Sequence, residues 1–387
     1  MTDLALSEEQ EALRGSARTL LQREWPPELA RRALAAGGDG HDADLWRRMC
    51  ELGWVGLAFP NDVGGGGGGL LDLAVVYEEA GRALVPTSLY STVEAALLIE
   101  RAGDDAQRTG LLRPVLAGDR IVSVAYHEDG VRASADALAT TSVLEGDAVV
   151  VNGTKLFVPN AGVADDLVVV ARDPVAAGAG GVRLVVVPTG APGVRRSRMG
   201  TFAHDAQHEV ALEAVRVPPD RVLAAGLPDA WSTVEGVRRV ATALQCVEMV
   251  GGARAVLDMT VGYVGDRSQF GRPIGSFQAV QHHVADLSTR IDAAGLAAWW
   301  AVWRCSVDGG RDDAIGGAQA AVAIAKVAAG DAYVEATLIA HQLHGGIGFT
   351  LEHDLHLWSD RARAATLTHG SREDHLRALG TLVARAR

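Results

Sequence analysis

Apolar residues recur at the spacing of a helix face through the first part of the chain. After Ser7 they fall at Leu13, Ala17 and Leu20, the period of an amphipathic helix. Ser7 followed three residues later by Gln10 is typical of a capping box, so we expect a helix to begin there. Further helices are expected over residues 44–52, 71–84, 93–102 and 106–116. Residues 1–117 are therefore predicted to form an N-terminal helical domain.

Six consecutive glycines at 64–69 separate two of these helices. Glycine loses more conformational entropy on folding than any other residue, so this run is expected to be a loop. No Gly-Lys-Ser or Gly-Lys-Thr follows it, and we therefore do not interpret it as a phosphate-binding loop.

The pattern changes to short β-rich runs across residues 118–228. Asn152-Gly153 lies between two of these runs, and this dipeptide is typical of a type I′ hairpin turn. We expect a small, barrel-like β-domain. Its predicted strands are 121–125, 148–151, 155–158, 167–170 and 182–187.

The helical period returns from residue 229 to 387. Long apolar patterns joined by short connections predict a C-terminal four-helix bundle. The fold class is then α+β, mainly α. The expected bundle helices cover residues 233–265, 277–307, 314–343 and 371–384.

Composition and charge narrow the range of partners. The net charge of the 387-residue chain is -12 at pH 7, which argues against nucleic acid and anionic membrane surfaces. The three cysteines have no metal-site or disulfide spacing, the N-terminus lacks the pattern of a signal peptide, and no apolar run reaches about 18 residues. These features predict a cytoplasmic protein. No histidine has a glutamate three residues before it, so no bundle metal site is expected.

Two motifs in the C-terminal third resemble the acyl-CoA dehydrogenase family. One runs from Arg267 through Phe270-Gly271 to Ile274 and continues as Phe277-Gln278 up to His282. The other is Gln342-Leu343-His344-Gly345-Gly346-Ile347-Gly348-Phe349. They occur in family order with the earlier Leu52-Gly53-Trp54 and Asn152-Gly153 segments. The resemblance covers essentially the whole chain and implies an FAD-dependent enzyme that oxidises an acyl-CoA thioester.

The resemblance also implies which residues hold FAD. Arg267 would reach the pyrophosphate of FAD in a neighbouring subunit, because a guanidinium offers a planar fork for it. The shared site makes a dimer, or a dimer of dimers, part of the expected assembly, and electron-transfer flavoprotein is the expected electron acceptor. The other implied cofactor residues are Gln269 and Phe270 near Arg267, Phe157 beside the flavin, Gln342, Gly345 and Gly346 along the adenosine half, and, without an assigned place, Gln278 and Ser371.

The catalytic base of the family is missing from both of its usual positions. The segment that carries a glutamate in many members is Thr368-His369-Gly370-Ser371, and the alternative position falls near Ala241. Three hypotheses stay open. His369 acts as the base, Glu248 acts from two turns away on the helix of Ala241, or this chain does not supply the base.

The segments that meet the flavin ring in the family also differ here. Only Glu128 survives from the Thr-Glu-Pro segment, and Pro159 replaces a hydroxyl residue after Phe157. The segments for the pyrophosphate and adenosine of FAD are thus kept better than those for the flavin ring. This difference resembles family members built from two different subunits, and it predicts a paralogous partner that carries the glutamate. Two rival hypotheses are a flavin-dependent monooxygenase on the same fold and a non-catalytic subunit that completes the FAD site of a partner.

Overall fold

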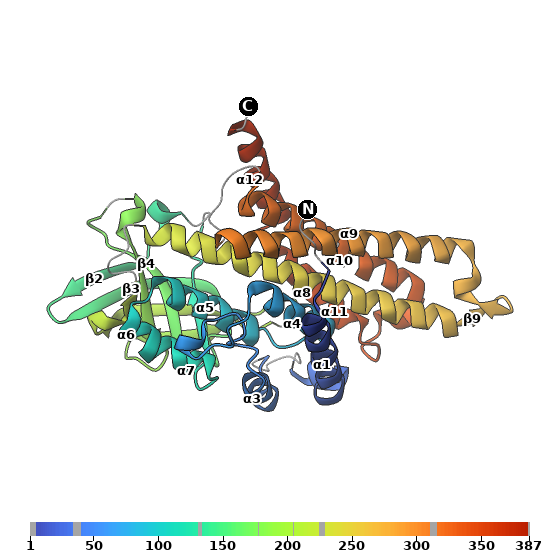
Figure 1. The fold of residues 1–387 in the computed structure, drawn as a ribbon, viewed down its shortest axis with the longest axis horizontal. Coiled ribbons are helices and arrows are strands. Elements are labelled where there is room, and N and C mark those ends of the chain that lie inside the picture. The colour runs from blue at the N-terminus through green and yellow to red at the C-terminus, as the bar shows by residue number, and fades with distance from the viewer. Residues whose placement is uncertain are drawn as a thin grey trace. The chain divides into compact units, whose positions relative to one another are not determined.

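A computed structural model of the protein describes residues 5–33, 40–130, 134–176, 178–203, 205–223, 229–309 and 316–385 (Figure 1). The chain divides into two compact units. The first contains Met1–Arg31, Gly69–Val85 and Arg239–Arg387, and the second contains Arg32–Gly68 and Pro86–Arg238. This division splits the expected N-terminal helical domain between the two units. The predicted boundaries at 117/118 and 228/229 stay a prediction.

The first unit is a helical bundle that also includes two helices from the N-terminal part of the chain. Helix α1 begins as expected, because Ser7 and Gln10 each bond the other's backbone N–H in a capping box. Helix α11 was not predicted, and it brings to five the bundle helices described beyond residue 229. The helices are α1 (Glu8–Glu24), α4 (Leu70–Arg82), α8 (Ala230–Asp266), α9 (Gln278–Asp308), α10 (Ala318–His344), α11 (Leu355–Leu367) and α12 (Arg372–Arg385). Helix α8 belongs to this unit from Arg239 onward, and its first turns belong to the second unit.

Helices α4 and α8 approach each other through two glycines. A methyl group at Gly81 would lie 2.0 Å from the backbone oxygen of Glu248, and one at Gly251 would lie 2.0 Å from that of Glu78. No side chain fits at either distance, so glycine at both positions lets the two backbones touch. The crossing fixes two buried acidic residues, Glu78 and Glu248, at one interface.

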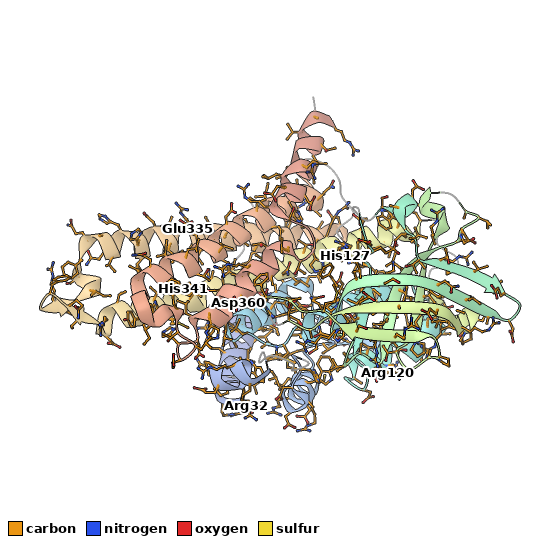
Figure 2. The ribbon with its side chains drawn as sticks, turned by 180° about the vertical axis from the view of Figure 1, so that it is seen from behind. Arg32, Arg120, His127, Glu335, His341 and Asp360 are labelled. Atoms are coloured by element: carbon orange, nitrogen blue, oxygen red, sulfur yellow. The ribbon has the colours of Figure 1, made fainter. Side chains whose placement is uncertain are left out.

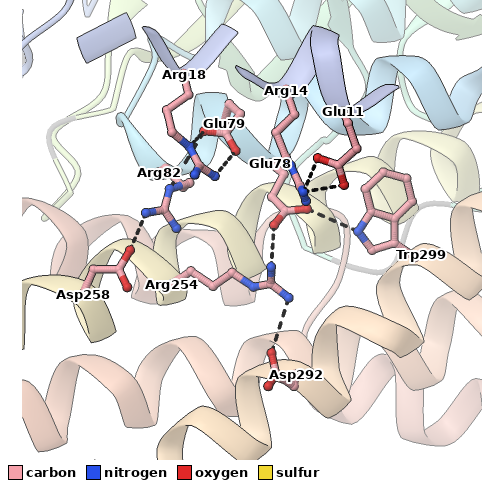
Figure 3. A network of polar contacts seen from close by, with 10 residues as sticks. All are labelled: Glu11, Arg14, Arg18, Glu78, Glu79, Arg82, Arg254, Asp258, Asp292 and Trp299. Carbon is pink, nitrogen blue, oxygen red and sulfur yellow. Dashed lines mark hydrogen bonds and ion pairs between the residues drawn. The ribbon is translucent and has the colours of Figure 1, made fainter. Parts of the chain in front are cut away.

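Buried carboxylates on α4 are paired with arginines of the surrounding helices (Figure 3). Glu79 accepts hydrogen bonds of 2.8 and 2.6 Å from Arg18 of α1. Glu78 accepts one of 3.0 Å from Arg254 of α8 and one of 3.3 Å from the indole of Trp299 on α9. Since a buried carboxylate without a partner is costly, this network ties the position of α4 to three other helices.

The second unit combines short helices with one eight-stranded sheet. The strand order is β6-β7-β3-β2-β4-β5-β8, and β1 pairs with β4 in parallel. Every valine and leucine of β4 is buried, which places the core against this strand. The strands are β1 (Val122–Ala125), β2 (Thr141–Glu145), β3 (Ala148–Pro159), β4 (Asp166–Arg172), β5 (Val182–Pro188), β6 (Val194–Arg198), β7 (Gln207–Val217) and β8 (Val222–Leu223).

Short helices and most of the glycine run complete the second unit. Residues 65–69 have no regular structure, as predicted, and a methyl at Gly65 would lie 2.2 Å from the backbone oxygen of Phe59. The expected helix over 106–116 contains a π-helical turn, Arg108–Leu112. The helices are α3 (Ala43–Glu51), α5 (Ser88–Ala102), α6 (Asp105–Gln107) and α7 (Arg113–Leu116), and α2 (Pro27–Ala33) crosses the boundary between the units.

The predicted hairpin turn at Asn152-Gly153 is wrong. Strand β3 runs unbroken through both residues, and the dipeptide forms an irregularity in its pairing with β7. Asn152 Oδ1 accepts a hydrogen bond of 2.7 Å from Ala214 N. A methyl at Gly153 would lie 2.5 Å from Thr140 Oγ1. A tertiary contact therefore explains this glycine, and β2 and β3 are joined instead through Gly146-Asp147.

Helix α8 is the one described helix that is long and apolar enough to cross a membrane. Its length is 37 residues, and 72% of its most apolar 18-residue window is buried inside the protein. Burial in a bundle core accounts for this hydropathy.

Candidate functional site

The segment that begins at Arg267 forms a protruding β-hairpin. Strands β9 (Ser268–Gln269) and β10 (Arg272–Pro273) pair across a two-residue turn. Both turn residues have positive φ, 55° at Phe270 and 82° at Gly271, as a primed hairpin turn requires. The Phe270 side chain is 92% exposed. The hairpin thus presents a large aromatic ring to a ligand or to another chain.

Three polar side chains of this segment make no ion pair or hydrogen bond within the described chain. Arg267, Gln269 and Gln278 are all exposed. Among the described residues, the Arg267 guanidinium has no ion pair, and the amide side chains of Gln269 and Gln278 have no hydrogen bond. Arg272 is engaged, with its Cζ 4.2 Å from the centroid of Phe277. These free donors suit a polar ligand.

The glycine pair after α10 also faces open space. Gly345 has a φ of 63°, which favours glycine, and no atom lies within 4 Å of a methyl added at Gly345 or Gly346. Gln342 is exposed beside them. The neighbouring His344 is buried, and it stacks on Tyr263 at a ring distance of 4.3 Å. The turn is therefore packed on one side through His344 and Tyr263 and has open space on the side of the glycines. A ligand that approaches the backbone closely requires such open space.

The loop at the family's base position is anchored by a buried lysine. Lys326 Nζ of α10 donates hydrogen bonds to Ala365 O at 2.5 Å, Thr368 O at 2.6 Å and Gln245 Oε1 at 2.7 Å. Burial lowers the pKa of Lys326 to about 8. His369 follows directly with a φ of 60° and is half-buried. The sequence analysis did not predict that Lys326 anchors this loop. A lysine inside an Ala-rich apolar stretch could have indicated a buried polar role.

Ser371 caps the last helix of the chain. Its hydroxyl donates to Asp374 Oδ2 at 2.8 Å and accepts from Asp374 N at 3.3 Å, so it closes the first turn of α12. Ser371 also lines a groove of about 510 Å³ between α10, the end of α11 and the start of α12. Its role as a cofactor contact stays a prediction.

Glu248 is held inside the bundle by an arginine of α11. Arg361 Nε donates to Glu248 Oε1 at 2.9 Å, and another nitrogen of the guanidinium donates to Val85 O at 2.9 Å. This ion pair gives Glu248 a structural role at the crossing of α4 and α8. Its role as a substitute base stays a prediction.

The predicted flavin contact of the second unit lies on β3. Phe157 has a φ of 51°, is 52% exposed, and lies two residues after Lys155. Lys155 is fully buried, and its Nζ donates to Glu128 Oε1 at 2.6 Å and to Tyr126 O at 3.3 Å. Glu128, the surviving residue of the family segment, thus holds a lysine. Residues 131–133 of the same segment lie outside the described part of the chain.

Comparison with known families accounts for nearly the entire chain. Residues 7–119 match the N-terminal domain of acyl-CoA dehydrogenases, residues 123–215 the middle domain, and residues 233–383 the C-terminal domain. The chain belongs to the acyl-CoA dehydrogenase family. As a member of the acyl-CoA dehydrogenase family it is an oxidoreductase acting on CH–CH bonds, and its mainly helical fold with a middle β-domain is the family fold.

One relative and two solved structures illustrate this membership. Acyl-CoA dehydrogenase IpdE2 of Mycolicibacterium smegmatis is 31% identical over 378 residues, 97% of this chain and 98% of the relative. A solved variant of the Tcur3481-Tcur3483 steroid ACAD is 33% identical with a TM-score of 0.84, covering 98% of each chain. The ChsE4-ChsE5 complex from Mycobacterium tuberculosis is 25% identical with a TM-score of 0.86, covering 99% of each chain.

The residues present fit the flavin that the acyl-CoA dehydrogenase family uses. The uncommitted guanidinium of Arg267, the open backbone at Gly345 and Gly346, and the exposed ring of Phe157 match a cofactor with a pyrophosphate, an adenosine half and an aromatic ring system. The Arg267 guanidinium has no ion pair among the described residues, and the Phe157 ring is exposed. The Gly345-Gly346 turn is open on its outer side, although Gly345 N already donates to His341 O.

Replacing Arg267 by alanine should weaken FAD binding about 10- to 100-fold, because a hydrogen-bonded charge is worth roughly 1.5–3 kcal/mol. The measurement is the FAD-to-protein ratio after dialysis, with the dissociation constant from fluorescence titration. Arg290→Ala is the matched control, since Arg290 is an exposed arginine of α9 that pairs with Glu335. Equal FAD affinity in both variants would contradict the assigned role.

Proposed function

We propose that this chain is one subunit of a heteromeric, FAD-dependent acyl-CoA dehydrogenase. The complex performs α,β-dehydrogenation of an acyl thioester, with the base supplied by a paralogous, glutamate-bearing subunit. FAD, when bound, supplies the hydride acceptor for the β-hydrogen. This chain contributes Arg267, Gln342, Gly345 and Gly346 to the cofactor site and passes electrons to an electron-transfer flavoprotein.

The observation that carries the proposal is the loop after α11. Lys326 fixes the carbonyls of Ala365 and Thr368, so the position of the next residue is set by the bundle. That residue is His369, where the resemblance places the family's glutamate. The scaffold of the base position is present and the carboxylate is absent, as expected when another chain performs the proton abstraction.

Two of the related structures support a two-chain assembly by their own composition. One of them is the ChsE4-ChsE5 complex, and the Tcur3481-Tcur3483 steroid ACAD likewise carries two joined names. Exposed apolar side chains on this chain suit burial by a partner. On α9 and α10 they are Leu296, Trp300, Val307, Ile324 and Leu338.

The cytoplasm is the proposed location. The cysteines Cys50, Cys246 and Cys305 are free, and two of them are buried. Free thiols persist in a reducing compartment.

The test compares the chain purified alone with the chain co-expressed with a glutamate-bearing paralogue. FAD stoichiometry and anaerobic bleaching of the flavin by acyl-CoA thioesters are measured on both. We expect bleaching only in the heteromer. Bleaching by the chain alone would overturn the need for a partner base.

Two other outcomes identify the rival functions. Oxygen consumption with peroxide release from reduced flavin, and no bleaching by any thioester, would indicate a monooxygenase. A heteromer that loses flavin when the cofactor residues of this chain are replaced, while no other replacement in this chain changes its turnover, would indicate a non-catalytic subunit that completes the FAD site of its partner.

A further inference from the structure

A tyrosine near the end of α8 holds the residue that precedes the Gly345-Gly346 turn. Tyr263 Oη donates to His344 O at 3.2 Å, and the two side-chain rings stack with their centroids 4.3 Å apart. His344 is the last residue of α10, so Gly345 follows it directly. One tyrosine therefore contacts both the ring and the carbonyl of the residue that leads into the turn.

The same tyrosine also lies one helical turn before Arg267. Arg267 N donates to Tyr263 O at 2.9 Å, which continues the hydrogen bonding of the helix. Arg267 O in turn accepts from Ile274 N at 2.8 Å, and this bond closes the hairpin. The two segments that we assign to FAD, the Arg267 segment (residues 267–274) and the Gly345-Gly346 turn, are therefore joined through Tyr263.

His344 is buried with one ring nitrogen unpaired. Its side chain is 3% exposed, and its Nδ1 lies 2.8 Å from Ala340 O, one turn earlier on α10. Because a carbonyl only accepts, Nδ1 carries the proton and the neutral ring leaves Nε2 without one. Nε2 is buried and has no hydrogen-bond partner among the described residues. A second proton at Nε2 would place a positive charge there without an acceptor, which is costly.

Two more histidines lie close to this ring. His353, in the loop before α11, meets the His344 ring edge-on at a centroid distance of 4.7 Å. His341 lies three residues earlier on α10, and Asp360 lies on α11 (Figure 2). Burial lowers the pKa of His341, and the charges of Arg363 and Asp360 act on it in opposite directions. A positive charge on His344 is therefore opposed by any positive charge on His353 or His341.

The packing of His344 depends on its being neutral. Burial lowers the pKa of His344, the bond to Ala340 O acts to raise it, and the charges of His353 and His341 lower it further. Below the ordinary value of 6.5 a released imidazole therefore binds more protons than the packed one. The packing free energy is fully present above pH 6.5 and decreases as the pH falls below that value. Acid should thus loosen the contact between His344 and Tyr263.

We propose that Tyr263 and His344 are positioning residues that hold the Arg267 segment and the Gly345-Gly346 turn in one FAD-binding arrangement, and that mild acid releases this arrangement. The inference rests on the proposed function, in which both segments belong to the cofactor site. Neither residue needs to contact FAD, because each acts through a segment that does. The affinity for FAD then depends on this pair as well as on the residues that meet the cofactor.

The first test measures FAD affinity by equilibrium dialysis of the FAD-binding complex that contains the full chain, at neutral pH. Tyr263→Phe keeps the stacked ring and removes the hydrogen bond to His344 O, so it should weaken FAD binding about 2- to 10-fold, the range for one hydrogen bond. Tyr263→Leu also removes the stack and should weaken binding further. Tyr333→Phe is the matched control at a buried tyrosine of α10, and it should leave the affinity unchanged.

The second test repeats the measurement as the pH is lowered from neutral to below 6.5. In the wild-type complex the FAD dissociation constant should rise by at most about tenfold per pH unit, the limit for one proton at His344. His344→Phe keeps a ring that can stack on Tyr263 but cannot be protonated, so its dissociation constant should stay flat. His41→Phe removes a half-buried imidazole of the second unit and should keep the wild-type dependence.

The outcomes separate this inference from the proposed function. A complex that binds FAD but oxidises no acyl thioester would refute the function, and both dialysis tests would still decide the inference. Unchanged FAD affinity in both Tyr263 variants would overturn the inference. So would a wild-type affinity that is constant across the pH range, or a pH dependence that His344→Phe retains.

Amide hydrogen exchange distinguishes a positioning role from general destabilisation. In Tyr263→Leu, exchange should be faster in residues 345–349 and unchanged in the other helices of the bundle, compared with the wild type at the same pH. Uniformly faster exchange across the bundle would show that the loss of FAD affinity reflects unfolding, and it would overturn the positioning role.

Discussion

Replacing His369 by glutamate should increase thioester-dependent flavin reduction by the chain purified alone roughly 10²- to 10⁴-fold, the range that a positioned general base contributes. The loop already holds this residue through the Lys326 hydrogen bonds to Ala365 O and Thr368 O. The positive φ of 60° at this position costs about the same for glutamate as for histidine, because neither residue is glycine. The substitution should therefore add no backbone strain. The measurement is the anaerobic rate of flavin bleaching with octanoyl-CoA.

His369→Gln is the matched control for this experiment. It offers a similar polar side chain without a base, so it should leave the rate of the isolated chain at its low starting value. A fall in rate with glutamine would identify His369 itself as the base. If glutamate produces no increase in a chain that binds FAD fully, the loop does not direct residue 369 at the substrate, and a base supplied by a partner is contradicted.

Replacing Lys155 by methionine should lower the free energy of unfolding by about 3–5 kcal/mol, the cost of breaking a buried ion pair from one side. The substitution leaves Glu128 with only the backbone N–H groups of Ala139 and Thr140, at 2.6 and 3.0 Å. Chemical denaturation measures the change. The double variant Lys155→Met, Glu128→Gln should recover part of the loss, because no unpaired charge remains.

The same pair predicts a pH dependence of stability. Burial lowers the pKa of Lys155 to about 8, although Glu128 acts to raise it. For Glu128, burial acts to raise the pKa, but the charge and hydrogen bond of Lys155 lower it overall. Between pH 8 and the ordinary value of 10.5 the unfolded lysine binds more protons than the folded one, so the free energy of unfolding rises with pH. The excess stability of the wild type over Lys155→Met should therefore grow through this window, and a flat difference would contradict the lowered pKa.

The sequence predicted those parts of the fold that depend on local pattern. The capping box of Ser7 and Gln10, the glycine loop at 64–69 and the long bundle helices follow from spacing and backbone entropy. The predicted cofactor residues Arg267, Gly345 and Gly346 came from motif resemblance, and the structure shows that they are exposed.

Tertiary contacts decided what the sequence did not predict. Asn152-Gly153 has the composition of a turn, but the contact with Thr140 and the bond from Ala214 place it inside β3. The pairing of Lys155 with Glu128 joins residues that are 27 apart along the chain. The hydrogen bond from Tyr126 to Glu235 joins residues that are 109 apart along the chain.

The glycine crossing of α4 and α8 has a consequence for synthesis on the ribosome. Gly81 and Glu78 lie early in the chain, and their partners Glu248 and Gly251 are made only after the whole sheet of the second unit. All residues of the second unit precede Arg239, so its sheet can close while α1 and α4 still lack a bundle to pack on. These helices then carry uncovered apolar surface, and Glu78 lacks its partner Arg254, until the last third emerges. At this stage a nascent chain most needs a chaperone.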